Sequence, residues 1–307
     1  MQMRRLNDKR QVLGRVGSAD MHLFRVFQTV AQCGGFSAAQ SELGVGRSTV
    51  SRQIGHLEDR LGYTLCHRGR SGFALTQHGE QALKYINVFL SAADDFASNM
   101  AGINEDFVGS INVAMIDFSF SDQANPMIKA IKAYHERAPK VSINLSIESP
   151  NQIERGVIEG KYHLGILPDY RRLDGLRYDV VYHETVELFA GRDHPLGKKV
   201  ASGIEPDLEE VFKHELVYRG YLEGDRLADI KKEFRRGATV LQTESVLVLL
   251  NAGIYLGFMP SHSATADVVS VRPDKFRYSV PICATTRSSR SRSLILNAFL
   301  EDLLSRS

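Results

Sequence analysis

The residues with the clearest chemistry lie between Arg47 and Arg52, where guanidinium and short hydroxyl groups share one stripe of a predicted helix. Val50, Ile54 and Leu57 recur at helical spacing and predict the buried stripe opposite. Arginine forks and hydroxyls near a helix N-terminus bind base edges and phosphates in the major groove of DNA. A solvated surface is the alternative, but such a surface usually favours Glu and Lys. The polar stripe consists of Arg47, Ser48, Ser51 and Arg52.

Metal, redox and catalytic chemistry find little support in the spacing of the reactive residues. The ten histidines include no HxxxH or HExxH pair, and the three cysteines include no CxxC pair. His194 precedes Pro195 in a predicted loop after a strand. The sequence has no GxSxG elbow, Walker loop or dinucleotide fingerprint. We therefore expect a protein that is not an enzyme, with no catalytic residue, metal site or cofactor. Cys66, beside His67 and Arg68, leaves redox sensing as a minor alternative.

Composition and charge suit a chain of two or three compact units. The 307 residues are 43% apolar, and no apolar stretch reaches the roughly 18 residues of a membrane-spanning helix. The basic N-terminus is not followed by an apolar run, so we expect no secretory signal, and unpaired cysteines fit a reducing cytoplasm. Residues 1–80 contain 11 Lys and Arg against 6 Asp and Glu, a net +5, and the remainder carries −3. This asymmetry favours a front end that binds nucleic acid, although a basic disordered extension explains part of it.

Three helices are predicted before residue 62. A first amphipathic helix contains Leu23–Ala31, and a second short helix opens at Phe36 with Ser37 as its N-cap. The tight turn at 44–46 joins the second helix to a third, which begins at Arg47.

A β-hairpin is predicted directly after the third helix. Two short apolar runs, Tyr63–Leu65 and Phe73–Leu75, flank a turn that contains glycine. Arg68 and Arg70 lie at its tip, where a wing would contact phosphate or the minor groove.

The segment from Leu23 to Glu80 resembles the N-terminal winged helix-turn-helix domain of LysR-type transcriptional regulators. The resemblance implies binding to double-stranded DNA and adds Thr49, Gln53 and Thr76 to the expected DNA contacts. The matching positions are Phe27, Gly35-Phe36-Ser37-x-Ala39, Leu43-Gly44, Val50-Ser51-Arg52-Gln53-Ile54, Leu57-Glu58, Leu61-Gly62, Leu65, Arg68, Leu75-Thr76 and Gly79.

Four positions depart from the pattern of the family. Gly46 replaces a usual serine, so the third helix begins with a weaker cap, and Arg47 replaces a frequent glutamine, which would alter the preferred DNA sites. Gln40 replaces a small residue, and Cys66 replaces an aromatic residue of the core. None of them removes a part that the fold needs.

One long helix is predicted from Glu80 to Asn104, because this segment has no Pro and no Gly before Gly102. The small winged domain cannot cover the whole apolar stripe of this helix, so we expect pairing with a second copy, which resembles the linker helix of the family. Ala82, Phe89, Phe96 and Ile103 widen the stripe. The expected dimerisation seam consists of Leu83, Ile86, Leu90, Ala93, Ala97 and Met100.

From Gly109 onwards, short apolar strands alternate with helices, which is typical of an α/β unit. This order resembles the two-lobed, periplasmic-binding-protein-like effector domain of LysR-type regulators. The resemblance implies lobe I at 109–168 plus 266–307 and lobe II at 169–265. The predicted strands are 111–116, 141–147, 164–167, 186–190, 215–218, 239–241 and 254–259. The predicted helices are 122–137, 151–159, 224–235, 244–252 and 290–304.

A cleft between two such lobes is the usual place for a small ligand. Helix N-terminal amides and Arg219 suit a carboxylate, whereas Asp117 and Glu244 favour an amine or a hydroxyl, so both ligand classes stay open. Ser149 also fits a helix cap. The expected effector-binding residues are Ile116, Asp117, Phe118, Ser119, Ser149, Asn151, Arg219, Tyr221 and Glu244.

These patterns predict an α+β multidomain protein. Its parts are a disordered basic extension at 1–19, a winged helix-turn-helix at 20–79, a linker and dimerisation helix at 80–106, and a two-lobed effector-binding domain at 107–307. We expect a sequence-specific transcriptional regulator in the cytoplasm, a homodimer or homotetramer on double-stranded DNA, controlled by a small-molecule effector. RNA polymerase is a further candidate partner, and no membrane partner is expected.

Two other functions compete with this prediction. A solute-binding protein of transport would have the same two-lobed fold, but the segment at 23–80 and the missing secretory signal argue against it. An enzyme built on this fold would need a nucleophile with a general base or a set of metal ligands, and the sequence offers none that is recognisable.

Overall fold

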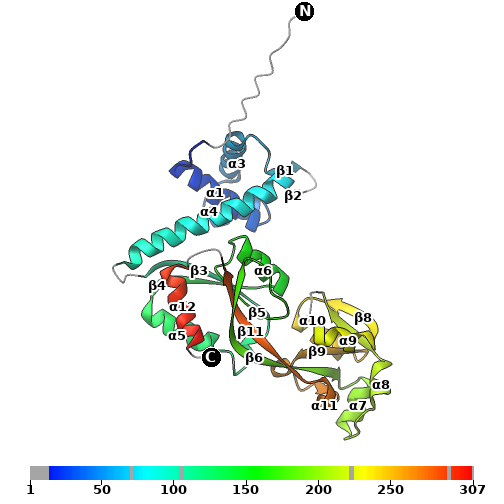
Figure 1. Ribbon diagram of the computed structural model, residues 1–307. Coiled ribbons are helices and arrows are strands. Elements are labelled where there is room, and N and C mark those ends of the chain that lie inside the picture. Colours follow the sequence, from blue (N-terminus) through cyan, green and yellow to red (C-terminus); the bar gives the residue numbers. More distant parts are fainter. Residues whose placement is uncertain (1–13, 70–71, 104–106, 221–224, 289–291, 306–307) are drawn as a thin grey trace, which may run out of the picture. The chain divides into compact units, whose positions relative to one another are not determined.

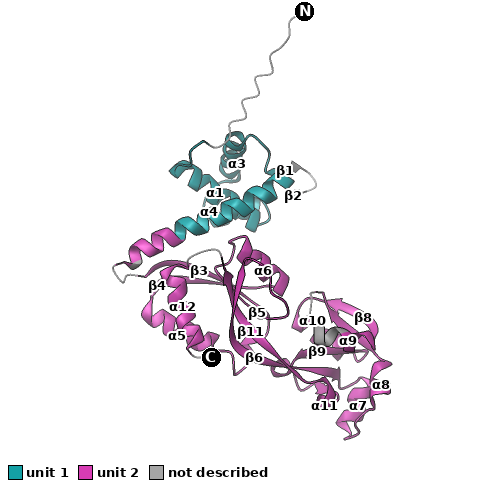
Figure 2. Cartoon of the chain, viewed as in Figure 1, with its two compact units in different colours: residues 1–94 teal, residues 95–307 magenta. Residues whose placement is uncertain are grey.

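The computed structural model describes residues 14–69, 72–103, 107–220, 225–288 and 292–305. The chain forms two compact units, residues 1–94 and residues 95–307 (Figures 1 and 2). No helix within the described ranges is long and apolar enough to cross a membrane. Arg70, Tyr221 and most of the expected basic extension lie outside the described residues.

The first unit is a winged helix-turn-helix, as predicted. Its helices are α1 (Ser18–Gln32), α2 (Phe36–Leu43), α3 (Arg47–Leu61) and the first part of α4 (Gln77–Gly102), and its wing is the antiparallel pair β1 (Cys66–Gly69) and β2 (Gly72–Leu75). One core joins these elements, with Phe27, Ile54 and Leu65 fully buried in it. Cys66 belongs to this core and is 1% exposed, which agrees with its prediction as a core residue.

The predicted N-cap of α2 is wrong. Helix α2 begins at Phe36 with Gly35 as its N-cap, so Ser37 lies inside the first turn. Gly35 has φ +151°, a conformation that favours glycine, and a Cβ there would lie 3.3 Å from Cβ of Phe73. The backbone requirement at Gly35 therefore decides where the helix begins.

The predicted strand at Tyr63–Leu65 is also displaced, because β1 begins only at Cys66. Oε1 of Glu58 accepts hydrogen bonds from the backbone N–H groups of Leu65 (2.8 Å) and Cys66 (3.3 Å). The side chain of Glu58 on α3 therefore holds the backbone at Leu65 and Cys66, where the chain enters β1.

The second unit is an α/β domain around one mixed sheet. Its strands are β3 (Val108–Met115), β4 (Lys140–Ile147), β5 (Leu164–Pro168), β6 (Leu176–Gly191), β7 (Glu215–Arg219), β8 (Arg235–Val240), β9 (Tyr255–Pro260), β10 (Val268–Ser270) and β11 (Tyr278–Arg287). Its helices are η1 (Ser119–Ser121), α5 (Met127–Arg137), α6 (Pro150–Ile158), α7 (Pro195–Ala201), α8 (Leu208–Phe212), α9 (Asp225–Lys232), α10 (Thr243–Asn251), η2 (Ser261–Ser263), α11 (Pro273–Phe276) and α12 (Leu294–Leu304). The strand order is β4-β3-β5-β11-β6-β9-β7-β8, and β10 pairs with β6.

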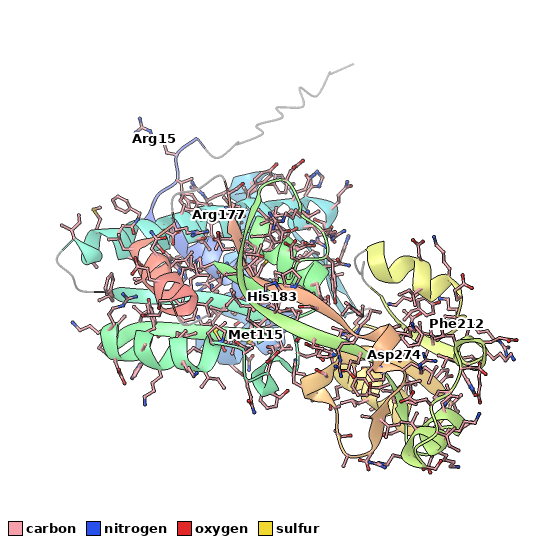
Figure 3. The ribbon with its side chains drawn as sticks, turned by 60° about the horizontal axis from the view of Figure 1, so that its bottom comes forward. Arg15, Met115, Arg177, His183, Phe212 and Asp274 are labelled. Carbon is pink, nitrogen blue, oxygen red and sulfur yellow. The ribbon has the colours of Figure 1, made fainter. Side chains whose placement is uncertain are left out.

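Two long strands, β6 and β11, run antiparallel through both lobes of this unit (Figure 1). In lobe I, α5 and α12 pack on one face of the sheet and α6 packs on the other. In lobe II, α8 and α11 contribute to the core on one face and α10 to the core on the other. Figure 3 shows Met115 in lobe I and Phe212 in lobe II, on opposite sides of the crossing.

The packing differs from the expected lobe boundaries at two places. Val268, Val271 and Phe276 pack in the cores of lobe II, although 266–307 was expected in lobe I. Residues 176–182 contribute to the cores of lobe I, although 169–265 was expected in lobe II. The reason is that β6 and β11 each cross in mid-strand, whereas the prediction placed the crossings in loops.

A buried histidine follows β6 in lobe II. His194 is 1% exposed, it is the N-cap of α7, and its Nδ1 accepts a hydrogen bond of 3.1 Å from the N–H of Leu196. Its ring centroid lies 4.5 Å from that of His214. Burial, followed by the charge of His214, lowers the pKa of His194 from 6.5 to about 4.

This pKa predicts a loss of stability in mild acid. Because the pKa is lower in the folded state, the unfolded chain binds more protons between pH 6.5 and pH 4, and the free energy of unfolding falls as the pH falls through this window, by about 3 kcal/mol in total. We predict that His194→Asn, which keeps a capping oxygen, flattens this dependence in urea unfolding followed by circular dichroism. Equal pH dependence in the variant and the wild type would contradict the assignment.

Candidate DNA interface and effector cleft

Helix α3 separates a buried apolar stripe from an exposed polar one. Val50, Ile54 and Leu57 are fully buried, whereas Arg47 and Arg52 are exposed. Ser48 is also exposed, and Thr49 and Ser51 are half-buried. The helix begins at Arg47 after Gly46, which offers no side-chain cap, and it ends at Gly62 in the left-handed conformation. The predicted polar stripe therefore lies at the surface, next to the helix N-terminus.

Two other expected DNA contacts are occupied within the protein. Nε2 of Gln53 lies 2.8 Å from Nε2 of His22 on α1. The hydroxyl of Thr76 accepts a hydrogen bond from the N–H of Gly79 (2.9 Å) and donates one to the carbonyl of Thr64 (2.7 Å), so it joins the start of α4 to the wing. Arg68 lies in β1.

A groove lies beside the polar stripe. Its walls come from the N-terminal end of α2, from α3 and from the wing. The lining residues are Gly34, Gly35, Phe36, Ser37, Ala38, Arg47, Ser51, His67, Gly72 and Phe73. Of these, Arg47 and Ser51 were predicted as DNA contacts. His67 was missed as a lining residue, and its only signal was its place in the wing.

Part of the expected dimerisation seam is used inside the first unit. Ile86 and Leu90 are buried in the core of that unit, and Leu83 packs against it. Ion pairing of Arg25 with Asp94 at 2.6 Å also fixes α4 to α1.

A neighbouring stripe of α4 remains exposed. Ala93 is half-buried and Ala97 is exposed. The large apolar side chains left open along the helix and its end are Tyr85 (77% exposed), Phe89 (37%), Phe96 (65%), Met100 (46%) and Ile103 (69%). Met100 among them belongs to the expected seam, and Phe89, Phe96 and Ile103 are the residues that were expected to widen it, so the exposed side chains lie on the widened side of the predicted stripe.

The cleft between lobes I and II leaves a cavity of about 20 Å³, room for little more than a single water molecule. Four of the expected effector-binding residues line it, namely Ile116, Asp117, Ser149 and Arg219. Phe118, Ser119, Asn151 and Glu244 do not line it. Instead, Ser119 is buried and donates a hydrogen bond to the carbonyl of Ile116 (3.1 Å), and Asn151 accepts one from Arg171 (2.9 Å).

Asp117 of lobe I binds the N-terminus of α10 in lobe II. Its Oδ2 accepts hydrogen bonds from the N–H groups of Thr243 (2.5 Å) and Glu244 (3.3 Å). Arg219 donates to the hydroxyl of Thr243 at 3.1 Å, next to the same carboxylate. Helix N-termini attract anions because their amide groups lack partners and the helix dipole is positive there. The chain therefore places its own carboxylate where an anionic ligand would bind.

At the N-terminus of α6, the predicted cap is confirmed. Ser149 and Gln152 form a capping box, and the hydroxyl of Ser149 donates a hydrogen bond of 2.6 Å to Oε1 of Gln152. Ser149 therefore lines the cleft with its polar atoms already engaged in the cap.

Three charged residues near the cleft were missed by the sequence analysis. Glu148 and Glu184 line the cleft. Lys231 is 7% exposed and lies beside the rings of Tyr218 and Phe258. Burial, with the charge of Arg219 as a second cause, lowers the pKa of Lys231 to about 7. Glu148 directly follows the predicted strand 141–147, next to Ser149, so its position was a usable signal. Glu184 lies within β6 and Lys231 within α9, and no local pattern identifies them.

Comparison with known proteins agrees with this architecture. The family described as "Bacterial regulatory helix-turn-helix protein, lysR family" matches residues 21–80, and the "LysR substrate binding domain" matches residues 106–307. The chain belongs to the LysR family and is a DNA-binding transcriptional regulator with an effector-binding domain.

Relatives in sequence and structure cover nearly the whole chain. The HTH-type transcriptional activator BauR of Pseudomonas aeruginosa is 33% identical over 294 residues, which are 94% of this chain and 96% of BauR. The crystal structure of full-length CbnR complexed with its target DNA has a TM-score of 0.62 at 20% identity, covering 94% of this chain and 99% of CbnR. A singly substituted variant of full-length OxyR from Pseudomonas aeruginosa has a TM-score of 0.61 at 18% identity, covering 92% of this chain and 94% of that variant.

Proposed function

We propose that the protein recognises DNA by inserting the polar stripe of α3 into the major groove. The observation that carries this proposal is the exposure of Arg52 opposite the buried side chains Val50 and Ile54, together with the exposure of Arg47 at the first position of the helix. Arginine forks bind guanine O6 and N7, and hydroxyls bind bases or phosphates. CbnR, a protein of the same fold, has a crystal structure in complex with its target DNA, which supports DNA binding by this fold.

The groove between α2, α3 and the wing suits a phosphate of the DNA backbone. Backbone amides at the start of α2 and the guanidinium of Arg47 both favour an anion. A phosphate contact would fix the position of the protein along the duplex, and base contacts from Ser51 and Arg52 would supply sequence specificity.

We propose that the exposed stripe of α4 pairs with a second copy of the chain. Its side chains follow one another at steps of three, four and seven residues, the spacing of a helix-pairing seam. A pair of chains would present two copies of α3 to a DNA site with two-fold symmetry. Assembly to a tetramer, a cytoplasmic location and contact with RNA polymerase remain predictions from the family.

We propose that the effector carries both an anionic and a cationic group. An anionic group would replace Asp117 at the N-terminus of α10, beside Arg219. The displaced carboxylate of Asp117 would then bind an amine, and Glu148 and Glu184 add negative charge to the same cleft. Because Asp117 joins lobe I to lobe II, such an exchange would change how the lobes meet and shift the population of DNA-binding assemblies.

Arg52→Ala should weaken binding to a genomic DNA site by about 1–3 kcal/mol if the side chain makes a bidentate base contact. The site is first identified by sequencing the genomic fragments that the protein retains, and affinities are then measured by fluorescence anisotropy. The logarithm of the binding constant should also fall steeply with the logarithm of salt concentration. Arg155→Ala, which removes an exposed arginine in the second unit, is the control and should bind normally. Equal retention of random fragments by the wild type and Ser51→Ala/Arg52→Ala would refute the proposal.

Phe96→Glu should raise the dissociation constant of the dimer by at least about 100-fold, because each copy loses a buried aromatic ring and gains a charge at the seam. Sedimentation equilibrium of the full chain checks this. Phe120→Glu is a matched control, since Phe120 is 69% exposed on η1. An unchanged assembly state for Phe96→Glu, or an equal change for both variants, would show that the exposed stripe of α4 does not pair.

The effector proposal predicts a preference that depends on Asp117. Among three compounds of equal chain length, an amino acid should bind at least about 10-fold more tightly than its deaminated acid or its decarboxylated amine, a difference of about 1.4 kcal/mol. Calorimetric titration of a panel of such sets checks this. Asp117→Asn should remove the preference over the acid, whereas Glu244→Gln should retain it. Tight binding of the plain acid by the wild type would contradict the proposal.

A further inference from the structure

We propose that Asp122, Glu184 and His262, where the two lobes meet, form a binding site for a divalent transition-metal ion such as Zn²⁺. The three residues come from the segment after η1 in lobe I, from the middle of the crossing strand β6, and from η2 after β9. They lie 62 and 78 residues apart in the chain, so no spacing motif indicates them.

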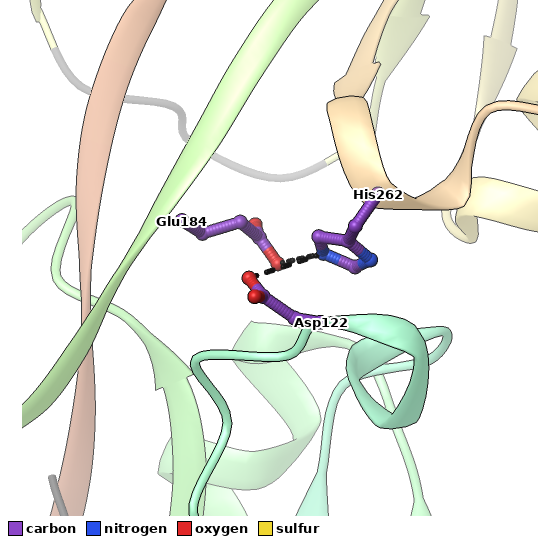
Figure 4. Close-up of side chains that lie close together, drawn as sticks. All are labelled: Asp122, Glu184 and His262. Atoms are coloured by element: carbon purple, nitrogen blue, oxygen red, sulfur yellow. Dashed lines mark hydrogen bonds and ion pairs between the residues drawn. The ribbon is translucent and has the colours of Figure 1, made fainter.

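Their ligand atoms converge on one point. Nε2 of His262 lies 2.9 Å from Oε1 of Glu184 and 3.6 Å from Oδ2 of Asp122, and one ligand atom from each residue lies within 4.8 Å of the others. Figure 4 shows the three side chains directed towards one another. Zinc binds His nitrogen and carboxylate oxygen at about 2.0–2.2 Å, which separates neighbouring tetrahedral ligand atoms by about 3.4 Å. Small side-chain rotations would therefore admit the ion.

The charges of the cluster do not balance without a cation. Glu184 is 3% exposed, and neither Glu184 nor Asp122 pairs with a lysine or an arginine in the described part of the chain. Even a protonated imidazole supplies one positive charge against two carboxylates. Buried carboxylates are costly unless they are paired or bind a metal. A divalent ion with a neutral imidazole would bring the net charge of the cluster to zero.

The imidazole is already oriented for metal binding. Oγ of Ser121 lies 2.8 Å from Nδ1 of His262 and so leaves Nε2 to face the two carboxylates. Metal-binding histidines commonly use their second nitrogen in this way, which fixes the tautomer and the ring. The combination of imidazole with carboxylates favours Zn²⁺ or Mn²⁺ over Mg²⁺ and Ca²⁺, which prefer oxygen ligands.

A second buried polar residue lies on the same strand face as Glu184. Tyr182 lies two residues before Glu184 on β6 and therefore on the same face of the strand. It is 6% exposed, and its hydroxyl has no hydrogen-bond partner among the described residues. Tyr182 therefore leaves a buried hydroxyl without a partner in the described ranges, two residues from Glu184 along the strand, and a bound water molecule would satisfy it.

Metal binding at this point would act on the regulatory domain. Asp122 comes from lobe I, His262 follows a strand of lobe II, and Glu184 also lines the effector cleft. An ion held by all three would join the lobes independently of the contact between Asp117 and α10. At 100 times its dissociation constant, such an ion would raise the ratio of folded to unfolded domain by about 100-fold.

The test is calorimetric titration of the full chain, freed of metal with a chelator, with Zn²⁺, Mn²⁺, Mg²⁺ and Ca²⁺ as separate probes. We expect one Zn²⁺ per subunit, no comparable binding of Mg²⁺ or Ca²⁺, and a visible absorption spectrum of the Co²⁺-loaded protein that reports nitrogen and oxygen ligands. His262→Gln and Asp122→Asn should weaken Zn²⁺ binding by more than about 100-fold, beyond what loss of an outer hydrogen-bonding partner costs.

Matched controls separate the cluster from the other histidines and acids. His135→Gln changes an exposed histidine of α5, and Glu187→Gln changes another buried acid of β6, which pairs with Arg277. Both should bind Zn²⁺ as the wild type does. Asp122→Asn tests the site even if a change at buried Glu184 prevents folding, and circular dichroism verifies each variant. A wild type that binds no Zn²⁺, or variants at 122 and 262 that bind it as tightly, would overturn the proposal.

Discussion

The burial of the apolar stripe of α3 is the constraint on which the rest of the structure depends. Val50, Ile54 and Leu57 are fully buried against α1, α2 and the wing. Since a helix repeats every 3.6 residues, fixing that stripe inside leaves the opposite one, with Ser48 and Arg52, at the surface, and Arg47 is exposed at the first position of the helix. At about 1.5–3 kcal/mol for each large apolar side chain, the same burial that stabilises the unit also orients the groups proposed to bind DNA.

A single carboxylate has a corresponding role in the second unit. Asp117 belongs to lobe I, yet it accepts hydrogen bonds at the N-terminus of α10 in lobe II. The long strands β6 and β11 cross between the lobes, and His262 of lobe II also lies 2.8 Å from Oγ of Ser121 in lobe I. Because this contact holds the two lobes together and also occupies the proposed ligand position, an effector that replaced it would directly change how the lobes meet.

The sequence predicted most of what is local or periodic and little of what depends on distant partners. Helix α3 begins at Arg47 as predicted, because its apolar spacing and flanking glycines are local signals. Strand β11 was missed, since its polar residues and Pro281 conceal a strand that is stabilised by β5 and β6 on either side. The predicted stripe of α4 divides in the structure, because periodicity identifies an apolar face without saying which of its residues, such as Ile86 and Leu90, pack within the same unit and which, such as Phe96, stay exposed.

The candidate sites follow the same division. The exposed polar stripe of α3, which we propose to bind DNA, is contiguous in sequence, so its residue types and spacing predicted its exposure. The cluster of Asp122, Glu184 and His262 is assembled from three distant segments, and only the fold brings it together. Thr76 illustrates a third case, in which a motif position is correct but its hydroxyl is used to join α4 to the wing.

The most direct test of recognition by α3 in the major groove is to replace single base atoms or groups within the genomic DNA site that the protein retains. Replacing guanine by 7-deazaguanine removes the N7 acceptor, and replacing thymine by uracil removes the methyl group, so both change only the major groove. We predict that such changes weaken binding of the wild type at two clusters of bases related by two-fold symmetry, and that Arg52→Ala loses sensitivity at one base pair in each cluster. Binding that is indifferent to every major-groove substitution, or sensitive in a single cluster only, would contradict recognition by paired α3 helices.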